Sequence, residues 1–197
     1  MLLDLMKPFL GDYRAAFTGS QIARMQKLNQ KTVSNTLNRL EKEGKLRSTR
    51  QGNQRFYQLN DFHFICALEH QKTSEFLRRH IEAKIALETI KAKGFVAVFG
   101  SYAKGQQRKG SDLDVFIAGT AEIRKTALPI HIDPKKYPLQ TFKSRKDSDF
   151  LAGEVIRHHI IIQGVEEFVG ICYEKYDSVV LTPEDRLKAQ GAGRTER

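Results

Sequence analysis

The chain has 197 residues, of which 40% are hydrophobic and 28% are charged, and this composition excludes a collagenous or wholly disordered protein. No apolar run approaches the roughly 18 residues of a membrane-spanning helix, and Asp4 stands where a signal peptide carries basic residues, so we expect a cytoplasmic protein. The formal net charge is +10, and residues 1–61 carry most of the excess, with 11 Lys and Arg against 5 Asp and Glu. This distribution favours a small nucleic-acid-binding module followed by a nearly balanced domain. The alternative is that the basic residues only make the surface soluble.

Residues 1–61 predict three helices followed by a β-hairpin. Apolar residues recur at helical spacing from Leu2 to Leu10. Thr18 and Gln21 have the spacing of a capping box that starts a second helix, and Asn29 can cap a third helix that stops at Gly44. Two strand-like runs, 45–50 and 54–59, then flank a glycine turn.

The segment from Val33 to Gly44, followed by this basic hairpin, resembles the winged helix-turn-helix family of DNA-binding domains. The resemblance implies that the second helix of the motif enters the major groove of double-stranded DNA and that the hairpin follows the backbone. The side chains expected to contact DNA are Lys31, Thr32, Ser34, Asn35, Asn38, Arg39, Arg47, Arg50 and Arg55. The alternative is a winged helix that serves only protein contacts or dimerisation. A homodimer is expected only by analogy with winged-helix proteins.

The next segment, residues 62–93, predicts a connecting helix in which apolar residues such as Phe76, Ile81 and Ile85 fall about one turn apart. Lys91, Lys93 and Gly94 have the pattern of a helix C-terminus, with basic residues in the last turn and a glycine stop.

The second module begins with an apolar strand, Phe95–Phe99, which leads into Gly100, Ser101 and a predicted helical turn, and a second strand covers residues 112–117. Because side chains alternate along a strand, Asp112 and Asp114 lie on one face. Two carboxylates so close repel one another and need a cation unless they are held in water, and oxygen ligands suit Mg2+ or Mn2+. Gly100 permits close backbone approach, and Ser101 with the following N–H groups can hold phosphate oxygens. This combination predicts metal-assisted phosphoryl or nucleotidyl transfer.

Phe99-Gly100-Ser101, ten further residues, and then Asp112-Leu113-Asp114 resemble the signature of the DNA polymerase beta-like nucleotidyltransferase superfamily, particularly its minimal members. The resemblance implies that Gly100 and Ser101 contact the β- and γ-phosphates of a nucleoside triphosphate and that Asp112 and Asp114 hold the divalent metals. Lys104 could also meet phosphate, and the alternative for it is a solvated lysine.

Active members of that superfamily place a third acid on a neighbouring strand. Here the candidate strand is 128–134, and Ile130 stands where we expect the acid. Asp133 lies three residues further on, an odd offset that reverses its face unless the register differs or the strand is bulged. We keep Asp133 as the candidate third catalytic acid, with Glu122 as a remote alternative. Without a third acid, metal and nucleotide could still bind, but the chemistry would lose its general base.

The expected fold class is α+β. The expected parts are a winged helix-turn-helix domain (1–61), a connecting helix (62–93), a small mixed-sheet nucleotidyltransferase domain (94–181) and a polar tail (182–197). The leading functional hypothesis is a DNA-binding enzyme that transfers a nucleoside monophosphate from a nucleoside triphosphate to an acceptor hydroxyl. The alternative is a non-catalytic transcription regulator whose degenerate transferase fold binds a nucleotide or a partner. The acceptor stays open between protein, RNA and a small molecule.

Overall fold

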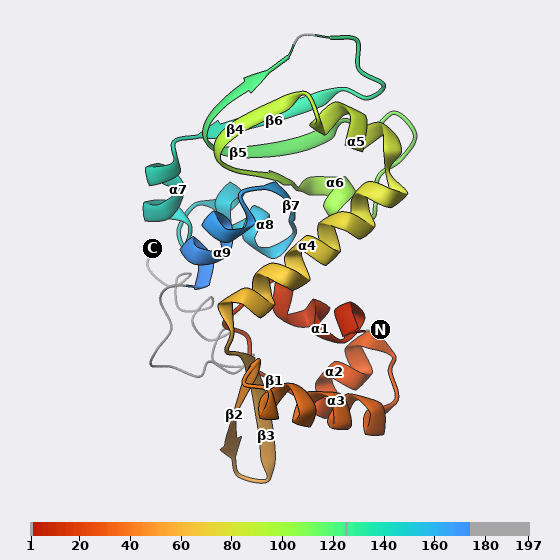
Figure 1. Ribbon diagram of the computed structural model, residues 1–197, viewed down its shortest axis with the longest axis vertical. Coiled ribbons are helices and arrows are strands. Elements are labelled where there is room, and N and C mark those ends of the chain that lie inside the picture. Colours follow the sequence, from red (N-terminus) through yellow and green to blue (C-terminus); the bar gives the residue numbers. More distant parts are fainter. Residues whose placement is uncertain (1, 125, 174–197) are drawn as a thin grey trace, which may run out of the picture. The chain divides into compact units, whose positions relative to one another are not determined.

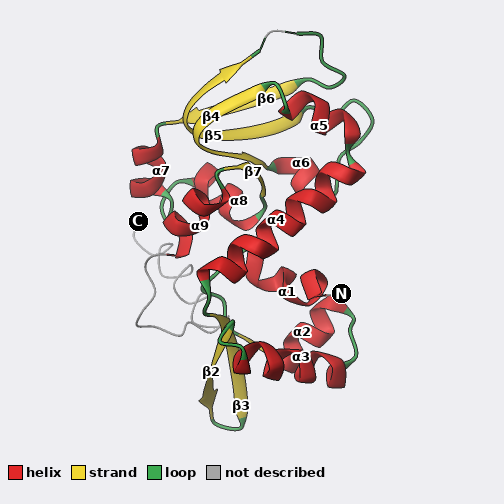
Figure 2. Cartoon of the chain, in the orientation of Figure 1, coloured by secondary structure: helices red, strands yellow, loops and turns green. Residues whose placement is uncertain are grey.

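The computed structural model describes residues 2–124 and 126–173, so the predicted tail and the end of the second domain lie outside the described residues. The chain divides into two compact units, a first that runs to Ile65 and a second over Cys66–Cys172, and each is described by itself. Both units contain helices and strands (Figures 1 and 2). None of the helices in the described ranges is long and apolar enough to cross a membrane.

The first unit combines helices with a small antiparallel sheet of strand order β1-β3-β2. Its elements are α1 (Leu2–Leu10), β1 (Phe17–Thr18), α2 (Gly19–Gln26), α3 (Gln30–Lys42), β2 (Leu46–Gln51) and β3 (Gln54–Leu59). The predicted capping box is present, because the Gln21 backbone N–H donates to the Thr18 hydroxyl and the Thr18 N–H donates to the Gln21 side chain. The Asn29 side chain caps α3. The helices and the hairpin therefore form where local sequence signals predict them.

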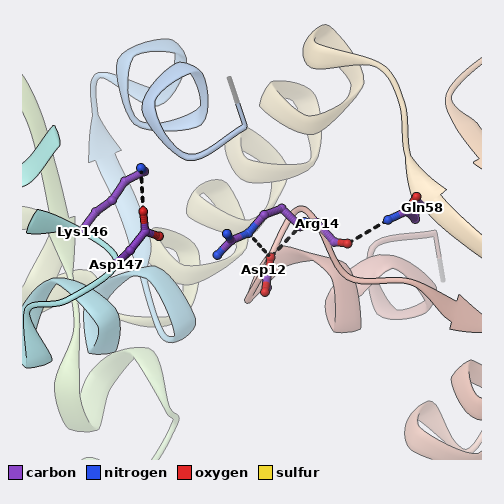
Figure 3. A network of polar contacts seen from close by, with 5 residues as sticks. All are labelled: Asp12, Arg14, Gln58, Lys146 and Asp147. Carbon is purple, nitrogen blue, oxygen red and sulfur yellow. Dashed lines mark hydrogen bonds and ion pairs between the residues drawn. The ribbon is translucent and has the colours of Figure 1, made fainter. Parts of the chain in front are cut away.

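A polar contact anchors β3 to the loop after α1. Gln58 is buried, and its Nε2 donates to the Arg14 carbonyl at 2.9 Å. The Arg14 backbone N–H and its Nε in turn donate to Asp12 (Figure 3). The bond to Arg14 satisfies the buried amide nitrogen of Gln58, which would otherwise be costly to bury.

The second unit is built around a mixed sheet of strand order β6-β5-β4-β7, in which only the β5–β6 pair is parallel. Its elements are α4 (Phe62–Arg79, whose first residues belong to the first unit), α5 (Ile81–Leu87), β4 (Ile90–Val98), α6 (Gly100–Ala103), β5 (Leu113–Ile123), β6 (Ile132–Tyr137), α7 (Leu139–Arg145), α8 (Phe150–Arg157), β7 (Ile160–Gln163) and α9 (Val165–Tyr173). This architecture confirms an α+β protein with a mixed sheet.

Both faces of this sheet are buried. One face packs Val96, Val98 and Val115 against apolar side chains of α4 and α5. On the other face, the rings of Phe95, Phe116, Phe142 and Phe168 form an aromatic cluster, with the Phe95 and Phe142 centroids 4.8 Å apart. Alternate residues of β4 and β5 therefore serve opposite cores, as the pleat requires.

The expectation of a single connecting helix over residues 62–93 is wrong. Helix α4 ends at Arg79, the short helix α5 follows, and β4 already begins at Ile90. Gly94 pairs with Gly119 inside the sheet, at φ 113°, and a Cβ on Gly94 would collide with the Ala118 carbonyl. Gly94 therefore allows strands β4 and β5 to approach closely, and it does not end a helix.

The expected strand over 128–134 is also displaced. Strand β6 begins at Ile132, which is buried and pairs with Leu113 of β5. Pro134 lies inside the strand, and it is tolerated because β6 is at the edge of the sheet. The register of β6 against β5 is the one that buries the Ile132 side chain.

Candidate functional site

Gly100 brings the end of β4 directly over a carboxylate of the neighbouring strand. The Phe99 N–H donates to the Asp114 carbonyl at 3.1 Å, and the chain then turns into α6. Gly100 has φ 65°, and a Cβ at this position would collide with the Asp114 carboxylate. Only glycine combines this left-handed conformation with this approach. Ser101, which follows, is half-buried in α6.

Three of the predicted acids gather at one end of β5 and β6. Asp112 lies just before β5, and Asp114 is on the same face two residues later. Asp133 pairs with Asp114 in the parallel register of β5 and β6, so their side chains project from the same face of the sheet. The prediction that Asp133 points to the opposite face of the sheet is therefore wrong. It assumed a strand over residues 128–134, whereas β6 begins at Ile132. Ile130 precedes β6 and is not in the sheet.

The electrostatics of Asp114 reflect this crowding. Burial, and then the negative charges of Asp133, Asp112 and Glu154, raise the pKa of Asp114 above its ordinary value, and Lys135 opposes them. Lys135 Nζ lies 3.0 Å from Asp133 Oδ2, and His131 Nδ1 lies 3.4 Å from Asp112 Oδ1. The acids therefore repel one another, and the positive charge of Lys135 partly offsets this repulsion at Asp114.

Lys104, one turn after Ser101, is an ion-pair partner. Its Nζ lies 2.7 Å from Oε1 of Glu154 on α8; Lys104 is exposed and Glu154 is half-buried. Sequence reasoning did not single out Glu154, because an acid within a helix has no local signal for what the helix packs against. The remote candidate Glu122 pairs with Lys91 in the β4–β5 ladder, at the opposite end of β5 from Asp114.

As donors, the acids of this unit offer only carboxylate oxygens, which suit Mg2+ or Mn2+. Across residues 2–124 and 126–173, however, no group of three or more His, Cys, Asp or Glu side chains already stands in a metal-binding arrangement. The Asp112 and Asp133 side chains are 59% and 40% exposed, so they have room to change rotamer.

The residues expected to contact DNA lie on α3 and the hairpin of the first unit. Of these, the ones with exposed side chains are Lys31, Thr32, Asn35, Asn38, Arg39 and Arg50, and the half-buried ones are Ser34, Arg47 and Arg55.

Arg55 is held in an internal network that ties the hairpin to α3. It forms an ion pair with Glu41, its Nε donates to the Ser48 hydroxyl at 2.9 Å, and its Nη1 lies 3.3 Å from the Asn38 side-chain oxygen. The Tyr57 hydroxyl donates to the same Asn38 oxygen at 2.9 Å. The hydrogen bond from Ser48, and then Arg55, lower the pKa of Glu41. Two of the expected DNA contacts, Asn38 and Arg55, thus have structural partners that local pattern did not indicate.

Comparison with known proteins identifies the second unit. A family model described as "Nucleotidyltransferase domain" matches residues 80–184, which include the Gly100 turn and all three acids. No curated protein and no solved structure matches the chain.

Proposed function

Because this chain belongs to the nucleotidyltransferase domain family, we propose that it transfers a nucleoside monophosphate from a nucleoside triphosphate to an acceptor hydroxyl and releases pyrophosphate. The observation that carries this proposal is the placement of Asp114 between the Gly100 turn and Asp133 of the adjacent strand. This placement puts a candidate phosphate-binding turn beside candidate metal ligands and a candidate base.

The acids would hold a divalent metal. Burial, and then the negative charges of neighbouring carboxylates, raise the pKa of Asp114, and a bound cation would stabilise its ionised form. Asp112 and Asp114 would be its ligands, after a change of rotamer. When bound, Mg2+ or Mn2+ supplies Lewis-acid stabilisation of charge on the phosphate oxygens.

The protein's own groups would position the substrates. The Gly100–Ser101 turn would bind the β- and γ-phosphates, and Lys104 could add a charge-assisted hydrogen bond if it leaves Glu154. Asp133 would accept the proton of the attacking hydroxyl as general base. Lys135, whose Nζ lies 3.0 Å from Asp133 Oδ2, would help to orient this carboxylate.

We further propose that the first unit is a winged helix-turn-helix that binds double-stranded DNA. Support comes from the order of its elements, from the basic excess of residues 1–61, and from the exposed polar side chains of α3. Lys31, Asn35 and Arg39 would reach base edges or phosphates from α3, and Arg50 would contact the backbone from the hairpin.

The non-catalytic regulator is the second candidate. It is favoured by the ion pairs Lys135–Asp133 and Lys104–Glu154, which engage a candidate base and a candidate phosphate ligand with groups of the protein itself. In that case the acids and the turn would bind a nucleotide without turnover.

One experiment separates the two candidates. Labelled nucleoside triphosphates are incubated with Mg2+, the full chain and protein, RNA or small-molecule acceptors. We expect label transfer by the wild type and by Glu122→Gln, an exposed control at the far end of β5. The double variant Asp112→Asn, Asp114→Asn should transfer none. Equal transfer by the double variant would refute the assigned site, and nucleotide binding without transfer by any form would favour the regulator.

A further inference from the structure

A cavity of about 240 Å3 lies in the first unit, whereas the acids of the candidate transferase site belong to the second unit. It is enclosed by α1, by the turn that precedes α3 and by one face of α3. Its lining residues are Leu2, Leu5, Leu28, Asn29, Thr32, Thr36 and Arg39. All belong to the same compact unit, so the cavity is formed by this unit alone.

The walls of the cavity differ in chemistry. Leu2 and Leu5 of α1 and Leu28 make an apolar side. Thr32, Thr36 and Arg39 recur at i, i+4 and i+7, so they form one continuous stripe along α3. An apolar body with a polar end is the kind of ligand that such a site accommodates.

The polar side of the cavity is positively charged. None of the lining residues is acidic, and the only charged one is Arg39. The Arg39 side chain is 65% exposed, and its Nε lies 3.8 Å from Glu43 Oε1, beyond the length of a good charge-assisted hydrogen bond. Arg39 therefore has donors available for an incoming carboxylate, which it can bind in a bidentate manner.

We propose that this cavity binds a small amphipathic carboxylate, with its apolar body among the leucines and its carboxylate on Arg39. The volume is below the roughly 300 Å3 at which pockets for drug-sized ligands begin, so the ligand is small. This binding does not depend on the transferase activity or on DNA binding.

The position of the cavity gives such a ligand a regulatory consequence. Thr32 and Arg39 line the cavity and are also among the residues expected to contact DNA. A carboxylate on Arg39 would withdraw this side chain from a phosphate or base, so ligand and DNA would weaken each other's binding. This second step rests on the proposed DNA-binding function.

Calorimetric titration of the full chain with octanoate tests the binding, with 1-octanol as the matched probe that lacks the charge. We expect octanoate to bind about tenfold more tightly than 1-octanol. Arg39→Gln should lower octanoate affinity about tenfold and leave 1-octanol binding unchanged. Arg24→Gln, an exposed arginine of α2 outside the cavity, is the control and should bind octanoate like the wild type. Circular dichroism checks that each variant is folded.

Three results would overturn the proposal: no octanoate binding at millimolar concentration, equal affinity for octanoate and 1-octanol, or full octanoate affinity in a folded Arg39→Gln variant. A dimer in sedimentation that octanoate does not perturb and that Leu28→Asp abolishes would show that a second copy covers the cavity, and this would also overturn it. If octanoate binds as expected but the chain binds no DNA, the cavity stands and only its regulatory consequence fails.

Discussion

Asp133 lies directly opposite Asp114 in the parallel register of β5 and β6, on the same face of the sheet. Burial raises the pKa of Asp114 most, and the negative charge of Asp133 is the next largest cause. The sheet therefore sets two carboxylates side by side, an arrangement from which a metal ligand and a general base can be drawn.

Asp133→Asn tests the role of this residue as base. We expect label transfer to fall by about 10²–10⁴-fold, because an amide cannot accept the hydroxyl proton. Binding of a non-hydrolysable triphosphate should persist, since the Gly100 turn is untouched. The measurement is the single-turnover rate with saturating nucleotide, with Glu122→Gln alongside. A wild-type rate for Asp133→Asn would remove Asp133 from the mechanism.

Gly100→Ala tests the close approach of the turn to Asp114. Gly105 provides a matched control, because it has nearly the same φ, 66° against 65°, but no neighbouring atom of the described chain lies within 4 Å of the position that its Cβ would take. Gly105→Ala should cost only the backbone strain, about 1–2 kcal/mol of unfolding free energy. Gly100→Ala should cost more and should abolish nucleotide binding, as measured by denaturant unfolding and by titration with the triphosphate. Equal losses in the two variants would mean that the contact with Asp114 is unimportant.

A buried ionic cluster in the second unit predicts acid sensitivity. Glu69 of α4 is fully buried, with His159 Nε2 at 3.1 Å and Lys72 Nζ at 2.5 Å from its two oxygens. Burial alone would raise the pKa of Glu69, but Lys72 and His159 outweigh it and lower the pKa from 4.5 to about 2. Because the folded pKa is the lower one, this stabilisation is present above pH 4.5 and is lost as the pH falls towards 2.

Glu69→Gln should therefore destabilise the protein near pH 7 by about 3 kcal/mol. The difference from wild type should shrink below pH 4.5, where the wild type itself loses the contribution of the cluster. Urea unfolding at a series of pH values measures this, with the exposed Glu82→Gln in α5 as control. A difference that does not change with pH would show that the Glu69 charge is not what stabilises the fold.

Two arginines of the hairpin should behave differently. Arg50 is exposed, so Arg50→Gln should leave stability unchanged and reduce the salt slope of DNA binding by about 1. Arg55 has its partners within the first unit, so Arg55→Gln should lower the unfolding free energy, because it leaves Glu41 and Asn38 without their cation. Fluorescence anisotropy with duplex DNA at several salt concentrations, together with urea unfolding, distinguishes these effects. An unchanged salt slope for Arg50→Gln would argue against a backbone contact by the hairpin.

Much of this protein follows from signals that act over a few residues. The capping box at Thr18 and the cap at Asn29 follow from hydrogen bonds within one helix turn, and the two-residue spacing of Asp112 and Asp114 sets both acids at the start of β5. The Gly100–Ser101 turn before an acid pair likewise identified the family from the chain alone. Such features are predictable because their physical causes lie within a single element.

Other features depend on which elements meet. Burial of Ile132 against β5 sets the register that places Asp133 beside Asp114. Gly94 lies in a strand because it pairs with Gly119 of β5. The Lys104–Glu154 pair joins residues 50 positions apart. No local pattern encodes these partners, because strand pairing and helix docking are selected by the free energy of the whole core and not by the residues of one segment.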